Sequence, residues 1–142
     1  MAPMLRAVAA FSVSVAIVLS VIPAVRAELP PQVYEQYQQE APEAVSLTIK
    51  SVKLTEKEQK ESTLISIVAE ARIDKVTRSA SGLKPGDTIR IVYEHRRDRE
   101  PVPGPSQPDI VKEGGRYPAF LQKQQDGSYG IAARGFSFRM AK

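Results

Sequence analysis

The sequence predicts an all-β fold, a small barrel of five or six bulged strands, and three observations predict it. First, from Val45 onward apolar residues alternate with polar ones in several runs. Second, the alternation changes phase inside two of these runs, which is typical of a β-bulge. Third, turn sequences rich in Gly, Pro and Asp separate the runs. Because bulges and glycines let long strands curve and close, a barrel is favoured over a sandwich.

An export signal is expected before this domain. Arg6 is followed by an uncharged, mostly apolar run over residues 7–25. Val25 and Ala27 then stand where a signal peptidase accepts small residues, which predicts a cleaved signal peptide over residues 1–27. The alternative is an uncleaved anchor, since the run approaches the length that spans a bilayer. Either outcome places the rest of the chain outside the cytoplasm, periplasmic or secreted, and cleavage leaves no membrane span.

Residues 28–44 are predicted to form a polar, acidic arm with a short helix. Pro30 and Pro31 suit the first turn of a helix, and Pro42 ends it. Val33 and Tyr37 would share one face of that helix, with Tyr34 beside them. The arm is interpreted as a tether or as a helix packed at the domain edge.

The barrel domain is expected over residues 45–142, and its first two strands carry the bulges. The first strand alternates through Val45 and Ile49 and resumes in the opposite phase at Val52. The charged residues 55–62 that follow are expected to be a solvated loop or a short helical turn. A long second strand covers residues 65–73, and Val76 breaks its phase.

Turn chemistry delimits the later strands. Residues 84–87, Lys-Pro-Gly-Asp, predict a type II turn before a third strand over 88–94. A fourth strand is expected over 116–124 and a fifth over 129–133, joined by a tight hairpin at Asp126 and Gly127. Phe136 and Phe138 are expected to continue the last strand beyond Gly135.

Several of these segments resemble a known group of barrels. Residues 76–79, 82–89 and Tyr93 look like the middle strands of the netrin-like or tissue-inhibitor-of-metalloproteinase-like OB barrels, and residues 115–121 and 126–129 are similar to their closing strands. The resemblance spans residues 45–138 and implies an OB-like barrel. The inhibitors contact metal through an N-terminal Cys, which this chain lacks, so protease inhibition is not implied. The segment between the third and fourth strands, where an OB barrel usually has a helix, is rich in proline here.

Composition excludes several kinds of chemistry. The 142 residues include no Cys and one His, which excludes disulfides, thiolate sites and a metal site with two His ligands. The sequence contains neither a nucleophile elbow nor a phosphate-binding glycine loop. No catalytic residue, metal or cofactor is therefore predicted.

The candidate binding site lies around the end of the third strand. His95, Arg96, Arg97 and Arg99 begin a long connection, rich in proline, that reaches residue 115. Long loops in compact domains are usually functional or disordered, and three arginines could hold an anionic group there. Tyr93, Arg116 and Tyr117 complete the predicted site. The alternatives are a passive solvated loop, or a small accessory enzyme or inhibitor with its site around His95.

The net charge of the mature chain limits the kinds of partner that it is expected to bind. Without residues 1–27 the chain has 18 Lys and Arg against 16 Asp and Glu, a net charge of +2. This charge is small for binding driven by phosphates, and export also argues against a nucleic acid. The sequence therefore predicts a non-catalytic, exported domain that binds a protein or an anionic component of the cell envelope.

Overall fold

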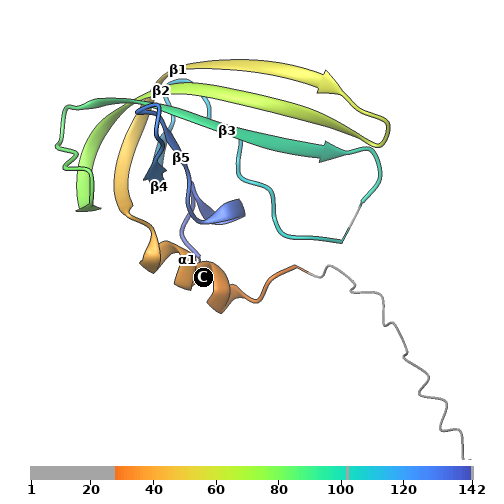
Figure 1. Cartoon of the computed structure of the whole chain (residues 1–142), viewed down its shortest axis with the longest axis horizontal. Coiled ribbons are helices and arrows are strands. Elements are labelled where there is room, and N and C mark those ends of the chain that lie inside the picture. Colours follow the sequence, from red (N-terminus) through yellow and green to blue (C-terminus); the bar gives the residue numbers. More distant parts are fainter. Residues whose placement is uncertain (1–27, 102, 142) are drawn as a thin grey trace, which may run out of the picture.

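The structure is a computed structural model that describes residues 28–101 and 103–141 (Figure 1). The expected signal peptide over residues 1–27 lies outside these described residues. Within them the chain forms one α-helix, five strands and a short 3-10 helix. In chain order they are α1 (Pro31–Glu40), β1 (Glu43–Glu58), β2 (Ser62–Ser79), β3 (Thr88–Asp98), β4 (Arg116–Lys123), β5 (Tyr129–Ile131) and η1 (Arg134–Phe136). The predicted all-β class is confirmed.

The five strands close into a barrel in the order β1-β2-β3-β5-β4. Neighbouring strands are antiparallel except β3 and β5, which run parallel and meet at Ile91 and Tyr129. The ring closes where β4 pairs with the first part of β1, from Glu43 to Thr48. Only one half of β1 therefore belongs to the closed barrel.

Alternating apolar side chains fill the barrel. Leu47, Ile67, Ile91 and Leu121 come from four different strands and are fully buried. Burying a side chain of this size stabilises a fold by about 1.5–3 kcal/mol relative to leaving it exposed. The inward residues of the strands thus form one continuous core.

The phase changes in the sequence are register irregularities between β1 and β2. Lys50 is the extra residue between the pairs Ile49–Ala71 and Ser51–Glu70. Two further shifts lie near Val76. An extra residue bends a strand and increases its twist, so these irregularities let the long strands curve around the core. The predicted bulges are confirmed.

The charged segment 55–62 is mostly strand, and its prediction as a loop or helical turn is wrong. β1 continues to Glu58 and β2 begins at Ser62, so residues 59–61 alone form the turn. The side-chain hydroxyl of Thr63 donates to Glu58 across the pair, at 3.0 Å. Charged residues are compatible with a strand whose side chains face water on both sides, and pairing with β2 decides the conformation here.

Both predicted turns are confirmed. Gly86 has φ +93°, and the Asp87 amide donates to the Lys84 carbonyl at 3.1 Å. Gly127 has φ +87° in the connection between β4 and β5. Glycine suits both positions because L side chains rarely adopt positive φ.

The sequence predicted that Phe136 and Phe138 continue the last strand, and this prediction is wrong. β5 ends at Ile131, and Phe136 lies in η1. Gly135 is packed so closely on the 106 region that a Cβ there would lie 2.5 Å from Ser106. Phe138 instead turns into the core, with its ring centroid 5.1 Å from that of Tyr93. Tertiary packing against the preceding loop therefore stops the strand.

Helix α1 packs beneath the barrel, starting at Pro31 as predicted. Its buried aromatic is Tyr34, whose ring centroid lies 4.3 Å from that of Phe136, whereas Val33 and Tyr37 are only half-buried. The buried Gln38 amide donates to the carbonyls of Phe136 and Arg139, at 2.9 and 2.7 Å. The arm is thus fixed to the C-terminal residues. No helix in the described part of the chain is long and apolar enough to cross a membrane.

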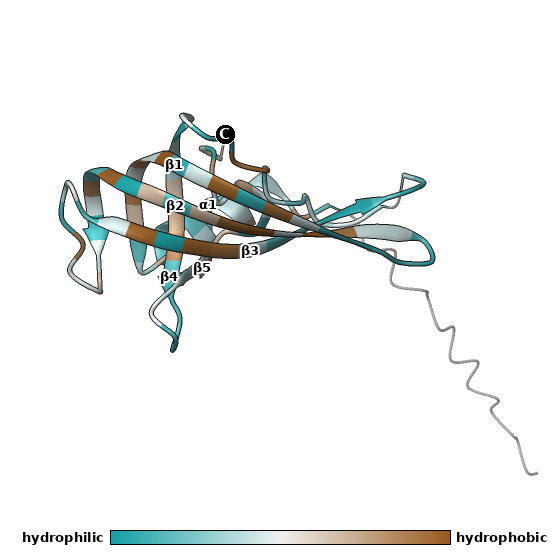
Figure 2. Cartoon of the chain, turned by 90° about the horizontal axis from the view of Figure 1, so that it is seen from above, coloured by the Kyte–Doolittle hydropathy of each residue, from teal (hydrophilic) through white to brown (hydrophobic). Residues whose placement is uncertain are grey.

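Three strands continue past the closed barrel as a curved ribbon (Figures 1 and 2). We define the ribbon as residues 51–58 of β1, 62–69 of β2 and 92–98 of β3. Its inner face carries Leu54, Ile67 and Tyr93, and its outer face carries Val68 and Val92, because paired residues share a face and adjacent residues do not. The predicted binding residues of β3 lie on this ribbon.

Candidate functional site

Tyr93 anchors the loop that follows β3. Its side chain is 5% exposed, its hydroxyl donates to the Asp109 carbonyl at 2.6 Å, and it accepts from the Val111 amide at 3.1 Å. Burial raises the pKa of Tyr93 to about 12, because the phenolate would lose its hydration. A ring held in this way packs the core, and it offers no exposed surface to a ligand.

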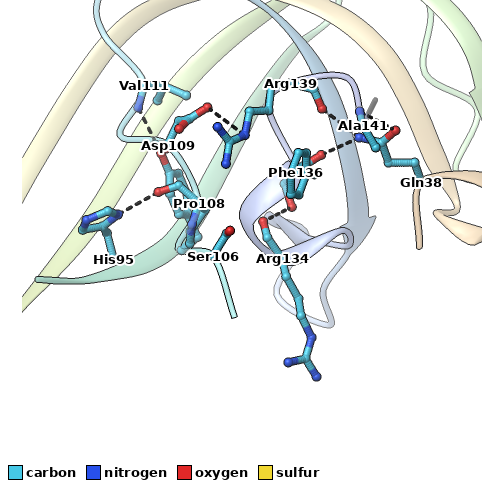
Figure 3. Close-up of polar contacts among 12 residues, drawn as sticks. Gln38, His95, Ser106, Pro108, Asp109, Val111, Arg134, Phe136, Arg139 and Ala141 are labelled. Atoms are coloured by element: carbon cyan, nitrogen blue, oxygen red, sulfur yellow. Dashed lines mark hydrogen bonds and ion pairs between the residues drawn. The ribbon is translucent and has the colours of Figure 1, made fainter. Parts of the chain in front are cut away.

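His95 and Arg96 continue this attachment along β3. The Nδ1 atom of His95 lies 2.7 Å from the Pro108 carbonyl (Figure 3). Because a carbonyl only accepts hydrogen bonds, Nδ1 carries the proton of this contact. The Arg96 backbone amide donates to the Gln107 side chain at 3.0 Å. We call residues 106–111 the strap, since they are bonded to β3 at several successive positions.

The strap also joins the other parts beneath the barrel. The Ser106 amide donates to the Tyr34 hydroxyl at 3.1 Å, and the Ser106 side chain bonds to Glu28. The Arg139 guanidinium lies 4.0 Å from the Asp109 carboxylate and over the ring of Phe136 (Figure 3). The second half of the predicted binding loop is therefore part of the folded body.

The three arginines at the end of β3 do not converge on one point. Arg96 points to the outer face, where it pairs with Asp98 at 3.0 Å, and Arg97 points to the inner face. Arg99 turns to the β1–β2 hairpin, where it donates to the carbonyls of Lys60 and Gln59 and pairs with Glu58 at 3.1 Å. The three guanidinium groups therefore have different surroundings, and their joint binding of one anionic group stays a prediction.

Arg116 and Tyr117 lie on β4, which pairs with the barrel half of β1 and not with the ribbon. Arg116 is opposite Thr48 and close to Asp74. The hydrogen bond from Thr48, then Arg72 and Arg116, lower the pKa of Asp74. The half-buried Tyr117 packs against Phe138 and accepts from the Lys112 amide at 3.0 Å. These residues belong to the barrel and do not join His95 in a site.

An exposed apolar stripe on the outer face of the ribbon was missed in the sequence. Val68 and Val92 are directly opposite each other. Leu64 lies on the same face of β2, four residues before Val68, with Ser66 between them. Val92 is 37% exposed, and Leu64 and Val68 are half-buried. The sequence did hold a signal, because Val92 is an apolar residue at a position that alternation assigns to water.

The charges around this stripe are balanced. Residues 56–61 and 94–100 together hold five Lys or Arg and six Asp or Glu. Two of the arginines, Arg96 and Arg99, are engaged in ion pairs. Such a surface does not concentrate positive charge, so it is poorly suited to a polyanion.

The other candidate sites in the described residues carry weaker signs of function. A groove of about 600 Å³ runs between the start of α1 and the C-terminal residues, and Tyr34, Phe136 and Arg139 contribute to its lining. Among residues 28–101 and 103–141 no three His, Cys, Asp or Glu side chains are grouped to hold a metal ion. The His95 side chain is bonded to a carbonyl, and no hydroxyl or carboxylate in the described residues is bonded to it as a nucleophile or orienting acid would be.

Comparisons with protein-family models, with curated proteins and with solved structures find no match to this chain. Any role of the ribbon and its outer face must therefore be argued from the geometry of this chain alone.

Proposed function

We propose that this protein is an exported, non-catalytic binding domain with an OB-like barrel, and that it binds another protein through the outer face of the ribbon. The five-stranded order β1-β2-β3-β5-β4 supports the OB-like assignment that the netrin-like resemblance implies. OB barrels use the face of their second and third strands, flanked by the loops between strands 1 and 2 and strands 4 and 5. In this chain those loops are residues 59–61 and 124–128.

The observation that carries the proposal is the exposed stripe of Leu64, Val68 and Val92. Val68 and Val92 are paired across β2 and β3, and Leu64 lies further along the same face beyond Ser66. Partly exposed apolar side chains with charged residues around them are typical of a transient protein interface. The balanced rim favours a protein with charges of both signs over an anionic envelope polymer.

A matched pair of charge substitutions tests this surface. The chain without residues 1–27 is used to capture partners from an envelope extract, and the binding of each purified partner is then measured with the wild type, Val92→Glu and Gln122→Glu. Val92→Glu should weaken binding at least about tenfold, because a buried unpaired carboxylate costs more than 1.4 kcal/mol. Gln122→Glu adds the same charge at an exposed position of β4 and should have no effect.

Two results would contradict the proposal. One is a partner that binds Val92→Glu as tightly as the wild type. The other is turnover of a small substrate that His95→Ala abolishes, which would favour the enzyme hypothesis instead.

A further inference from the structure

We propose that the free edge of β1 pairs with the same edge of a second copy of this chain, which joins two ribbons into one continuous antiparallel sheet. In the described residues β4 covers this edge as far as Thr48, and Gly114 and Gly115 bond to Ile49 at 2.8 and 2.9 Å. From residue 51 to residue 58, β1 has β2 on one side, and on the other side no strand of residues 28–101 or 103–141 pairs with it. Figure 1 shows β1 as the outermost strand of the ribbon.

The backbone groups that point to this edge follow from the hairpin. The Gln59 amide donates to the Ser62 carbonyl at 2.9 Å, so the backbone of Gln59 faces β2. Backbone direction alternates along a strand, and the N–H and C=O groups of Val52, Leu54 and Glu56 therefore point to the free edge. Leu54 is also 50% exposed, which is high for a leucine in a strand. The edge thus offers unpaired donors and acceptors beside an exposed apolar side chain.

Charge and steric fit select one register for self-pairing. A twofold axis at Leu54 places Leu54 opposite Leu54 of the other copy, Val52 opposite Glu56, and Lys53 opposite Thr55. No two like charges then face each other, and about six backbone hydrogen bonds form. Isologous pairing of this kind buries the exposed leucine of both copies at once.

The neighbouring registers are worse. An axis at Thr55 places Lys53 opposite Lys57 twice, and an axis at Glu56 places two Glu56 side chains opposite each other. Like charges directly opposite destabilise a sheet. An axis at Lys53 would bring the second copy's Lys57 against Ile49, whose edge is already bonded to Gly114 and Gly115. The Leu54 register is the one that avoids both problems.

Cysteine variants test the register directly, because the chain contains no Cys. In a hydrogen-bonded antiparallel pair the two Cα atoms lie about 5.5 Å apart, within the range that a disulfide spans. Under mild oxidation Leu54→Cys should therefore form a disulfide-linked dimer rapidly, and Lys53→Cys and Glu56→Cys should not. Equal cross-linking at all three positions, or none at position 54, would overturn the register.

The oligomeric state tests the pairing itself. In sedimentation experiments over a dilution series, the chain without residues 1–27 should be a dimer that dissociates reversibly. Leu54→Pro removes a donor that faces the edge and keeps the bonds to β2, so it should raise the dimer dissociation constant at least tenfold. Leu54→Lys, which keeps the backbone unchanged, should do the same, and Lys53→Glu should leave the constant unchanged. A wild-type chain that stays monomeric, or whose edge pairs only with a strand of another protein, would refute the proposal.

Discussion

The two ends of the same three strands have opposite surroundings. In the barrel, β1 lies between β2 and β4, and its Leu47 is completely buried. Seven residues later, in the ribbon, Leu54 of the same strand is half exposed and β4 no longer covers the edge. Along one strand, a leucine is therefore part of the core where a second strand closes the edge, and half exposed where that edge is open. Four measurements test this contrast.

The largest difference is expected between the two leucines of β1. Leu47→Ala should lower the free energy of unfolding by about 2–5 kcal/mol, because it removes buried methyl groups and leaves a cavity. Leu54→Ala, the matched control, should cost less than about 0.5 kcal/mol. Urea denaturation of both variants at low protein concentration measures the difference. Equal losses would show that Leu54 contributes as much to the stability of the fold as a fully buried leucine of the barrel.

A smaller effect is expected where the strap meets the ribbon. Tyr93→Phe removes the hydroxyl that binds the Asp109 carbonyl and the Val111 amide. It should cost about 1–3 kcal/mol, because the buried Val111 amide and the half-buried Asp109 carbonyl lose this partner. The amides of the strap should then exchange hydrogen faster than those of the barrel strands.

Tyr93 should also make the stability of the fold depend on pH. The pKa of Tyr93 is about 12 in the folded chain and about 10 when unfolded, so the unfolded chain loses this proton first. Stability should therefore fall as pH rises from about 10 to about 12, by up to about 1.4 kcal/mol per pH unit from this group. Denaturation at several alkaline pH values should show a shallower decline in Tyr93→Phe. An identical decline in both proteins would contradict the role of this residue.

The smallest effect is expected at the tip of the ribbon. Arg99→Ala removes the ion pair with Glu58 and the bonds to the hairpin carbonyls, and should cost no more than about 1 kcal/mol because these groups are exposed. Arg97→Ala, the control two residues earlier at the end of β3, should leave stability unchanged. Hydrogen exchange in residues 57–63 should rise only in Arg99→Ala. An increase of the same size in both variants would show that the hairpin does not depend on Arg99.

The candidate site was harder to predict than the fold. The sequence predicted a site at the end of β3, from His95 to Arg99, and grouped Tyr93, Arg116 and Tyr117 with it. Two of these, Tyr93 and Tyr117, pack against the same Phe138 in the core, and Arg116 lies on another strand. Residue type alone does not distinguish a tyrosine that binds a ligand from one that anchors a loop, because both need an aromatic ring and a hydroxyl.

Features that depend on near neighbours in the chain can be predicted from the sequence. The alternation of Val45 to Ile49, the phase change before Val52 and the turns at Gly86 and Gly127 all follow from side-chain size and backbone freedom within a few residues. Other features depend on long-range packing: charged residues 55–58 form a strand, Phe138 turns inward, and Arg96, Arg97 and Arg99 point to three different surroundings. These outcomes depend on which distant segment pairs with each residue, and long-range register sets which face of a strand meets the core.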